Sequence, residues 1–274
     1  MRRDQHEVEL EVLVTVKAYP TPSMRYSECV CVAGLRLDTP KPEWVRLYPV
    51  AFRDLPRTRQ FNKYDVIKLR ARPRAGDSRP ESFSPNVDTI EVLGQVAAAN
   101  GWAERIPFID SVRIASMCEL YRRQERDGTS LGVFRPAEIV DFEPTATSPE
   151  WDQRRQNALG QGSLFCVEQK RPLEKIPFEF RFLFRCDDPA CNGHRMSMID
   201  WEIGENYRKT RGRHPDERLR LVHERWMGLV CGPGRETHFY AGNLAKRHTT
   251  FVLLGAFWPP KQKAEPSTQE LVLF

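Results

Sequence analysis

The sequence lacks several short motifs that mark common enzyme classes. It contains no phosphate-binding loop of the G-x-x-x-x-G-K-[ST] type, no G-x-G-x-x-G dinucleotide fingerprint and no H-E-x-x-H metal motif. ATP hydrolysis and nicotinamide-dependent hydride transfer therefore have no support in these residues. An internal repeat is also missing.

Long apolar runs are missing as well. None approaches the roughly 20 residues that a membrane-spanning helix needs, and the charged residues 1–7 contain no apolar signal region. The seven cysteines are odd in number and scattered through 274 residues, a length that does not need disulfides. We therefore expect a cytoplasmic protein with reduced thiols and no membrane association.

Positive charge is present but unevenly distributed. The chain has 42 Lys and Arg against 37 Asp and Glu, a formal net charge of +5. Between residues 46 and 79 there are ten basic and three acidic side chains. A local excess of this kind indicates a basic patch rather than a general contribution to solubility.

Apolar periodicity predicts four strands in the first 72 residues, over 7–19, 27–37, 44–50 and 64–72. The short turns between them favour a compact antiparallel sheet, most simply a small barrel. A later helix, with Ile114, Met117, Cys118 and Tyr121 as its apolar stripe, ends before Gly128. We therefore predict an α+β protein that begins with an antiparallel β-barrel-like domain with helices.

Composition divides the chain into four parts. Residues 144–172 are rich in Thr, Ser, Gln and Gly and are interpreted as a linker. The predicted barrel domain occupies residues 1–143, and a smaller zinc-stabilised α/β domain occupies residues 173–260. Residues 261–274 are polar at first and are interpreted as a flexible C-terminal tail.

A close group of metal-ligating side chains follows an aromatic strand at 178–184. Cys186, Cys191 and His194 have the spacing C-x4-C-x2-H within a tight turn, and zinc prefers four tetrahedral nitrogen or sulfur ligands. Cys231 is the first choice for the fourth ligand, because it ends a predicted helix from which the chain can fold back. The other candidates are His223, His238, Asp187 and Asp188.

The three residues also have an interpretation without metal, and a bound zinc could be structural or catalytic. Without a metal, Cys186 is a core thiol at the end of a strand and His194 is a surface residue. If zinc binds, a structural site is favoured, because a catalytic zinc keeps an open position and usually has His or carboxylate ligands.

Acidic residues nearby suggest a second kind of chemistry. Asp200 and Glu202 are candidate catalytic ligands for Mg²⁺ or Mn²⁺ in a metal-dependent nuclease. Glu168 and Lys170 match the short E-x-K pattern of nuclease strands, although such short patterns often mislead. The alternative for Asp200 is the N-cap of the helix that follows it.

The basic segment is the third candidate site. Lys68, Arg70 and Arg72 alternate along one strand and therefore project from the same face. Together with the cations of the preceding and following loops they predict a surface that binds the phosphates of DNA or RNA. The alternative is a solvated strand face. The predicted nucleic-acid-binding residues are Arg53, Arg57, Arg59, Lys63, Lys68, Arg70, Arg72 and Arg79.

Two short segments suggest a protein partner. The tail contains Gln269, Leu271, Leu273 and Phe274, which resembles the Gln-Leu-Leu-Phe peptides by which bacterial DNA-processing proteins dock on the sliding clamp. The segment from Gln161 to Phe165 resembles the shorter form of that peptide. The alternative for the tail is an edge strand that packs against the domain.

These observations favour a nucleic-acid-binding protein of DNA metabolism, repair or antiviral defence with a structural zinc site. Two other functions stay open at this point. One is a metal-dependent nuclease or another base-acting DNA enzyme. The other is an adaptor that docks through its C-terminal tail.

Overall fold

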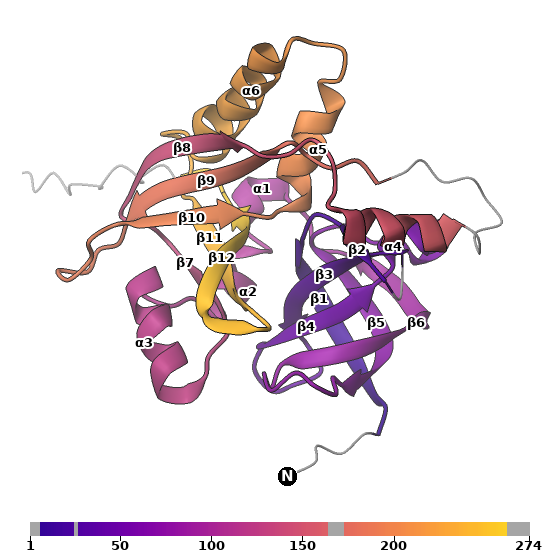
Figure 1. The fold of residues 1–274 in the computed structure, drawn as a ribbon. Helices are drawn as coiled ribbons and strands as arrows, with labels where there is room; N and C mark the ends of the chain where they lie inside the picture. Colours follow the sequence, from indigo (N-terminus) through magenta and orange to yellow (C-terminus); the bar gives the residue numbers. More distant parts are fainter. Residues whose placement is uncertain (1–5, 25–26, 164–172, 262–274) are drawn as a thin grey trace, which may run out of the picture.

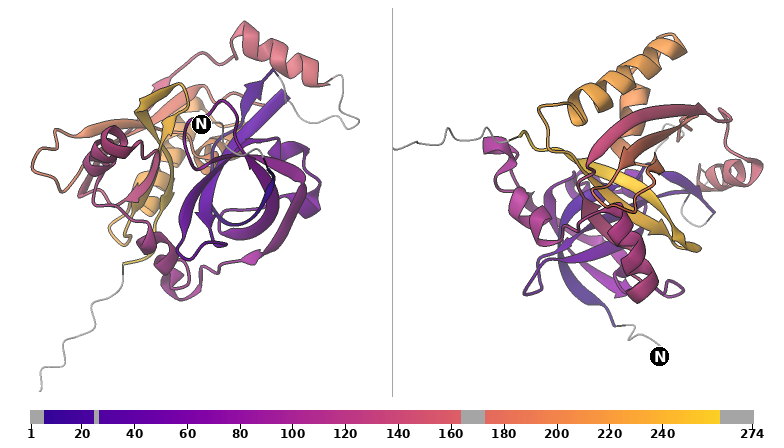
Figure 2. Two further views of the ribbon diagram at one scale, coloured as in Figure 1. Left: turned by 90° about the horizontal axis from the view of Figure 1, so that it is seen from below. Right: turned by 90° about the vertical axis from the view of Figure 1, so that its left-hand side faces the viewer.

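A five-stranded closed barrel forms the first part of the chain (Figures 1 and 2). The computed structural model describes residues 6–24, 27–163 and 173–261. Around the barrel the strand order is β1-β5-β6-β4-β3, and pairing of β3 with β1 closes the ring. Only β4 and β6 pair in parallel. The barrel strands are β1 (Val8–Lys17), β3 (Ser27–Arg36), β4 (Glu43–Val50), β5 (Asp65–Pro73) and β6 (Ser82–Gln95).

Alternation in the sequence decides which side chains fill the barrel. Along β5, Ile67 and Leu69 are buried inside, whereas Lys68 and Arg70 point outward. The middle of β1 is apolar on both faces, because one face lines the barrel and the other contacts the second sheet. At Gly34 of β3 a Cβ would lie 2.3 Å from the Leu13 carbonyl oxygen, so glycine permits the close approach that closes the ring.

Short elements surround the barrel. β2 pairs with β3, and two 3₁₀ turns precede β5. Two short helices then lead from the barrel toward the second sheet. These elements are β2 (Thr21–Ser23), η1 (Phe52–Asp54), η2 (Arg57–Arg59), α1 (Ala99–Trp102) and α2 (Ile106–Ser111).

A six-stranded mixed sheet forms the second part, in the order β7-β11-β12-β10-β9-β8. Its pairs are antiparallel except for β10 and β12, which are parallel. Aromatic side chains of β9 and β11 pack beneath the helices in one buried core. The strands are β7 (Leu131–Phe134), β8 (Glu138–Ala146), β9 (Phe178–Arg185), β10 (His194–Met198), β11 (His238–Leu244) and β12 (Arg247–Phe257).

Helices flank this sheet and the barrel (Figure 1). α3 packs against β7 and β12, and α4 lies against β2 and β3 of the barrel. α6 continues directly into a π-helix, η3, that includes Trp226. The helices are α3 (Met117–Asp127), α4 (Gln153–Ser163), α5 (Trp201–Lys209), α6 (Pro215–His223) and η3 (Glu224–Val230).

The barrel and the second sheet share a third buried core. Leu13 and Val16 of β1 pack there against Tyr240 of β11 and Leu254 of β12. The backbone joins the two parts as well, because Ala18 bridges to Asp200 just beyond β1. The two parts therefore meet over packed side chains and main-chain hydrogen bonds.

The prediction of an α+β protein with a barrel is confirmed, and the division into domains stays a prediction. β7 and most of β8 lie before residue 143 but belong to the second sheet. The segment predicted to be a linker, 144–172, contains the end of β8 and helix α4. In the described part of the chain, no helix is both long and apolar enough to cross a membrane.

Candidate functional site

Three thiols and one imidazole come together between α3 and the β9–β10 turn. Cys118, Cys186, Cys191 and His194 offer ligand atoms that all lie within 4.8 Å of one another. The Nε2 atom of His194 is 3.3 Å from the Cys118 sulfur and 3.4 Å from each of the other two sulfurs. Three sulfurs and one imidazole nitrogen form a donor set typical of structural zinc sites. The cluster could hold a metal ion.

Two of the four groups favour the form that a metal binds, whereas burial raises the pKa of Cys118 to about 12 and also raises the pKa of Cys186. The backbone N–H groups of Cys186 and Gly193 donate to the Cys191 sulfur. Burial alone raises the pKa of Cys191, but these hydrogen bonds outweigh it and lower the pKa below its usual value. Burial lowers the pKa of His194, which favours the neutral imidazole that a metal needs.

The fourth member of the cluster differs from the predicted one. Cys231 does not belong to it, because this thiol follows η3 and lies outside the group of four ligand atoms. Cys118 of α3 is the fourth member. The sequence placed Cys118 in the apolar stripe of a helix, and its distance along the chain from Cys186 gives no metal signal.

The other predicted ligand candidates also lie elsewhere. Asp188 accepts a hydrogen bond from Arg122 at 2.8 Å, and Asp187 is exposed. The His223 ring faces Phe142. His238 contacts the backbone carbonyl of Glu236 through Nδ1, at 3.0 Å.

The basic strand face is balanced by acidic residues of its neighbour. Lys68 lies 2.8 Å from Glu9, and Arg70 and Arg72 lie 3.9 and 3.8 Å from Glu7. The three cations do share one face, as their spacing indicates. Antiparallel pairing with β1 sets Glu9 opposite Arg70, so this surface is mixed in charge rather than uniformly positive.

The loop cations have separate surroundings. Arg53 pairs with Glu28 at 2.9 Å and Arg59 with Asp88 at 3.0 Å, whereas Arg57 is exposed on η2. Arg53 and Arg59 therefore each have an acidic partner, as the strand cations do.

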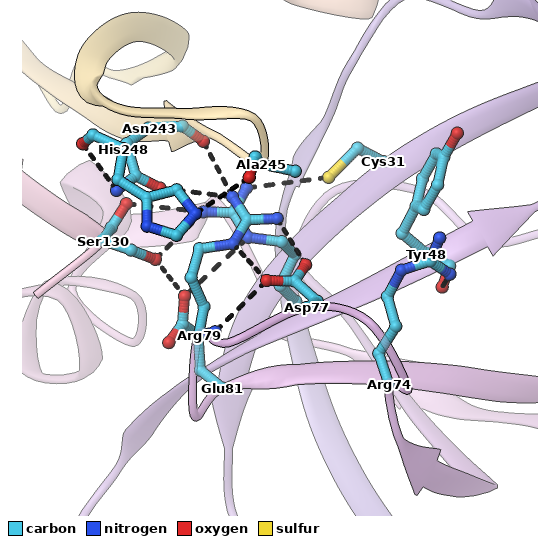
Figure 3. Close-up of polar contacts among 11 residues, drawn as sticks. Cys31, Tyr48, Arg74, Asp77, Arg79, Glu81, Ser130, Asn243, Ala245 and His248 are labelled. Atoms are coloured by element: carbon cyan, nitrogen blue, oxygen red, sulfur yellow. Dashed lines mark hydrogen bonds and ion pairs between the residues drawn. The ribbon is translucent and has the colours of Figure 1, made fainter. Parts of the chain in front are cut away.

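Arg79 is buried between the barrel and the β11–β12 hairpin (Figure 3). Its guanidinium donates to both carboxylate oxygens of Asp77, at 2.8 and 2.6 Å, and to the Asn243 carbonyl at 2.9 Å. Burial alone raises the pKa of Asp77, but the contacts with Arg79 outweigh it and lower the pKa to about 2. These contacts give Arg79 a structural role in joining the two parts.

Ser130 lies in a sequence pattern that marks the nucleophile of some hydrolases, but its contacts indicate a structural role. The residues Gly128-Thr-Ser130-Leu-Gly132 match the pattern G-x-S-x-G, which in hydrolases places a nucleophile between a strand and a helix. Here the order is reversed, from α3 to β7. The Ser130 hydroxyl is buried, donates to Glu81 and accepts from Arg46 (Figure 3). Ser130 therefore belongs to the contact between the two parts.

A cleft of about 380 Å³ opens where the barrel meets the second sheet. Three of the predicted site residues, Lys63, Asp200 and Glu202, come together at or beneath it. We call it the Trp cleft. It is lined by Lys17, Asn62, Lys63, Tyr64, Trp102, Arg105, Trp201, Glu202, Arg225, Ala256 and Trp258.

A buried ion pair forms the floor of the Trp cleft. Lys63 Nζ donates to Asp200 Oδ2 at 2.6 Å, and the Asp200 side chain is fully buried. Burial raises the pKa of Asp200, and the neighbouring Lys63 opposes this effect. At Gly255 of β12 a Cβ would lie 2.7 Å from Asp200 Oδ2, so glycine makes room for the pair.

Asp200 has a second structural role. Its Oδ1 accepts a hydrogen bond from the Glu202 backbone N–H at 2.9 Å, which makes it the N-cap of α5. The alternative interpretation of Asp200 as a helix cap is thus confirmed. The Glu202 carboxylate, which is 51% exposed, faces the cleft 3.4 Å from Lys63.

Lys17 lies in an aromatic surrounding at the same site. Its Nζ is 4.0 Å from the ring centre of Phe52 and 5.0 Å from that of Trp201, and it donates to the Phe61 carbonyl at 2.9 Å. Burial and the neighbouring Lys63 lower the pKa of Lys17 to about 8. The side chain therefore carries a positive charge at neutral pH.

The backbone is strained where it presents two of the aromatic side chains. Tyr64 has φ 67° and Trp102 has φ 71°, in the left-handed region that bulky residues rarely adopt. Arg225 comes from the π-helix η3, and π-helical turns occur often at functional sites. Strained residues persist where the surroundings hold them, typically in ligand sites. Three local distortions therefore converge on the Trp cleft.

Several predictions lie outside the described residues. Glu168 and Lys170 of the E-x-K pattern are among them, as is the tail from Gln269 to Phe274. Gln161 falls within α4, but Leu164 and Phe165 of the same clamp-like segment lie outside. The nuclease strand and the clamp-binding peptides thus stay predictions.

Two family models match the chain. The one described as Domain of unknown function (DUF8757) matches residues 113–273, more than half of the chain. The one described as Domain of unknown function (DUF8758) matches residues 8–111. Their junction falls directly after α2, between the barrel part and the second sheet.

A search of curated proteins gave no match. One similar solved structure is described as a murine DNA binding protein bound with double-stranded DNA. It is 10% identical, with a TM-score of 0.31, over 95% of this chain and 98% of that chain. A likeness at this level carries no argument about function.

Proposed function

We propose that this chain, which belongs to the family described as Domain of unknown function (DUF8757), binds nucleic acid through the Trp cleft. The observation that carries the proposal is the combination of aromatic and cationic side chains in one open site. Three tryptophans and four cations line it, together with the Glu202 carboxylate.

The aromatic walls suit unpaired bases. Trp102 and Trp258 are in contact, with ring centres 5.1 Å apart, and Trp201 lines the cleft as well. All three rings are half-buried, so each keeps an accessible surface. Every base has a flat π-face, and stacking on an aromatic side chain contributes about 1–3 kcal/mol per base.

The cations suit the phosphates that accompany those bases. Arg225 is exposed, with its guanidinium 5.4 Å from the ring centre of Trp258. Arg105 lies 3.9 Å from the ring centre of Tyr64 and keeps that ring in place. Arg225 is therefore the cation best placed to meet a phosphate, whereas Arg105 supports the aromatic wall.

Both parts of the chain supply this site. Lys17, Tyr64 and Trp102 come from the barrel part, and Trp201 and Trp258 come from the second sheet and its helices. The Trp cleft exists only when both parts are present, which supports one functional unit rather than two independent domains.

Fluorescence anisotropy of labelled single-stranded DNA and RNA tests the proposal directly. We expect affinity to fall steeply as salt is raised, and we expect Arg225→Gln to weaken binding and reduce the salt slope by about one phosphate contact. Arg220→Gln is the matched control, because Arg220 lies on α6 outside the cleft and pairs with Glu224. An affinity that changes neither with salt concentration nor in Arg225→Gln would overturn the proposal.

We also propose that the Cys118–Cys186–Cys191–His194 cluster holds a structural zinc ion. Tetrahedral bonds of about 2.0–2.3 Å put neighbouring ligand atoms roughly 3.3–3.8 Å apart, and the sulfur–nitrogen distances here are 3.3 and 3.4 Å. With three thiolates and one imidazole, no position is left open for substrate. Zinc would join α3 to the β9–β10 turn.

A further inference from the structure

We infer that Glu202 reads the edge of one nucleobase in the Trp cleft and that guanine is the base it selects. This inference rests on the proposed function and names the ligand of the same site. It follows from the position of one carboxylate among cations and from the hydrogen-bonding groups of the four bases.

The position of Glu202 does not fit contact with phosphate. A carboxylate repels phosphate oxygens, so it weakens a surface that only follows a nucleic-acid backbone. Glu202 nevertheless faces the Trp cleft with half of its side chain exposed. A carboxylate accepts hydrogen bonds and donates none, so it suits a ligand group that presents N–H donors.

The surrounding structure holds this carboxylate in place. Glu202 is in the first turn of α5, and its backbone N–H is fixed by Asp200. Its Oε1 lies 3.4 Å from Lys63, which Asp200 holds at 2.6 Å. The buried pair beneath Glu202 thus restrains both its helix and its side chain, and Lys63 adds a donor beside the acceptor.

The chemistry of the bases then separates guanine from the rest. Guanine presents two adjacent N–H donors, on N1 and on the exocyclic N2, which match the two oxygens of a carboxylate, and its O6 accepts from a neighbouring cation. Cytosine and adenine present one amine beside a ring nitrogen that is an acceptor. Uracil and thymine present one N–H between two carbonyl oxygens. Each of these would set an acceptor against the second carboxylate oxygen.

The size of the Trp cleft agrees with a single nucleotide. Its volume of about 380 Å³ is in the lower part of the range of about 300–1,000 Å³ for small-molecule sites. A base extruded from a strand enters such a pocket, stacks on aromatic side chains and is read on its Watson–Crick edge.

Quenching of tryptophan fluorescence by GMP, AMP, CMP and UMP tests the inference, because all four carry the same phosphate. We expect GMP to bind about tenfold or more tightly than the other three. In Glu202→Gln this preference should disappear, and xanthosine monophosphate should bind better than to the wild type, because an amide can donate to its O2. Glu205→Gln, on the same helix and paired with Arg208, should leave the preference unchanged.

The outcomes separate this inference from the proposed function. Equal affinities for the four nucleotides, with oligonucleotide binding still lost in Trp258→Ala, would refute guanine selection and leave nucleic-acid binding in place. A guanine preference that survives in a folded Glu202→Gln protein would also refute the role of Glu202. If neither nucleotides nor oligonucleotides bind, both proposals fail. Should Glu202→Gln not fold, the wild-type preference among the four nucleotides still decides whether the cleft selects guanine.

Discussion

Lys63 and Asp200 are 137 residues apart in the sequence, yet Lys63 Nζ lies 2.6 Å from Asp200 Oδ2 beneath the Trp cleft. Lys63 precedes β5 of the barrel, and Asp200 caps α5 beside the second sheet. The pair therefore links the two parts of the chain where their shared cleft is formed. It also fixes Glu202, which lies two residues further along the same helix.

Breaking this pair should cost more stability than any exposed ion pair. Lys63→Met leaves the buried Asp200 carboxylate without its partner, and we expect the free energy of unfolding to fall by about 3–5 kcal/mol. Urea denaturation of Lys63→Met and of Lys68→Met gives the comparison, because Lys68 pairs with Glu9 on the surface, where water screens the interaction and its loss should have little effect on stability. Equal losses in both variants would refute a buried link.

The pair between Asp77 and Arg79 should make stability depend on pH. Arg79 lowers the pKa of folded Asp77 to about 2, from an ordinary value of 3.8. A carboxyl group whose pKa is lower in the folded than in the unfolded protein stabilises the fold at pH values above the unfolded pKa. The contribution of Asp77 to the free energy of unfolding, about 1–2 kcal/mol, is therefore lost as pH falls from about 4 to 2.

Urea denaturation at pH 5 and pH 2.5 measures this loss against a matched variant. In Asp77→Asn the part of the pH dependence that belongs to Asp77 should vanish, so stability should decline less between the two pH values. An unchanged decline would show that Arg79 does not hold Asp77 in its ionised form.

Two cysteine variants should distinguish the observed cluster from the predicted one. Cys118→Ser removes a proposed zinc ligand, and we expect metal content to fall from about one zinc per chain to near zero, together with a loss of stability. Cys231→Ser leaves the cluster intact and should keep its zinc. Mass spectrometry under native conditions gives both values; zinc retained in Cys118→Ser but lost in Cys231→Ser would contradict the assignment.

The basic face of β5 should matter little for binding. Arg70 and Arg72 lie near Glu7, so we expect the double variant Arg70→Gln, Arg72→Gln to keep its affinity for single-stranded DNA within about threefold at 150 mM salt. Anisotropy titrations check this value. A loss of affinity as large as that in Arg225→Gln would show that the face of β5 binds the DNA.

The sequence predicted local features well where one strand or one turn decides them. The alternation Lys68, Arg70, Arg72 gives their common face without knowledge of a partner. The spacing of Cys186, Cys191 and His194 likewise brings three candidate ligands together around a single turn. The contacts of Glu7 and Glu9 with those cations could not be predicted from the sequence, because the pairing of β1 with β5 depends on how the barrel closes.

Features that depend on distant segments could not be predicted from the sequence. Cys118 enters the Cys/His cluster because α3 packs beside the β9–β10 turn, and its apolar neighbours gave it the pattern of a core residue. The Trp cleft is assembled from both parts of the chain, and no local pattern connects Trp102 with Trp258. Arg79 was predicted to bind nucleic acid because it lies in the basic segment, but the β11–β12 hairpin packs over it and buries it.

Comparison of two tryptophan variants tests the central claim, that the Trp cleft binds nucleic acid, most directly. Trp258 lines the cleft, whereas Trp151 lies just before α4 and donates to the Leu173 carbonyl. We predict that Trp258→Ala weakens binding of single-stranded DNA by about 1–3 kcal/mol, roughly five- to 150-fold, and that Trp151→Ala leaves it unchanged. Equal affinity of the folded Trp258→Ala protein and the wild type would contradict the claim.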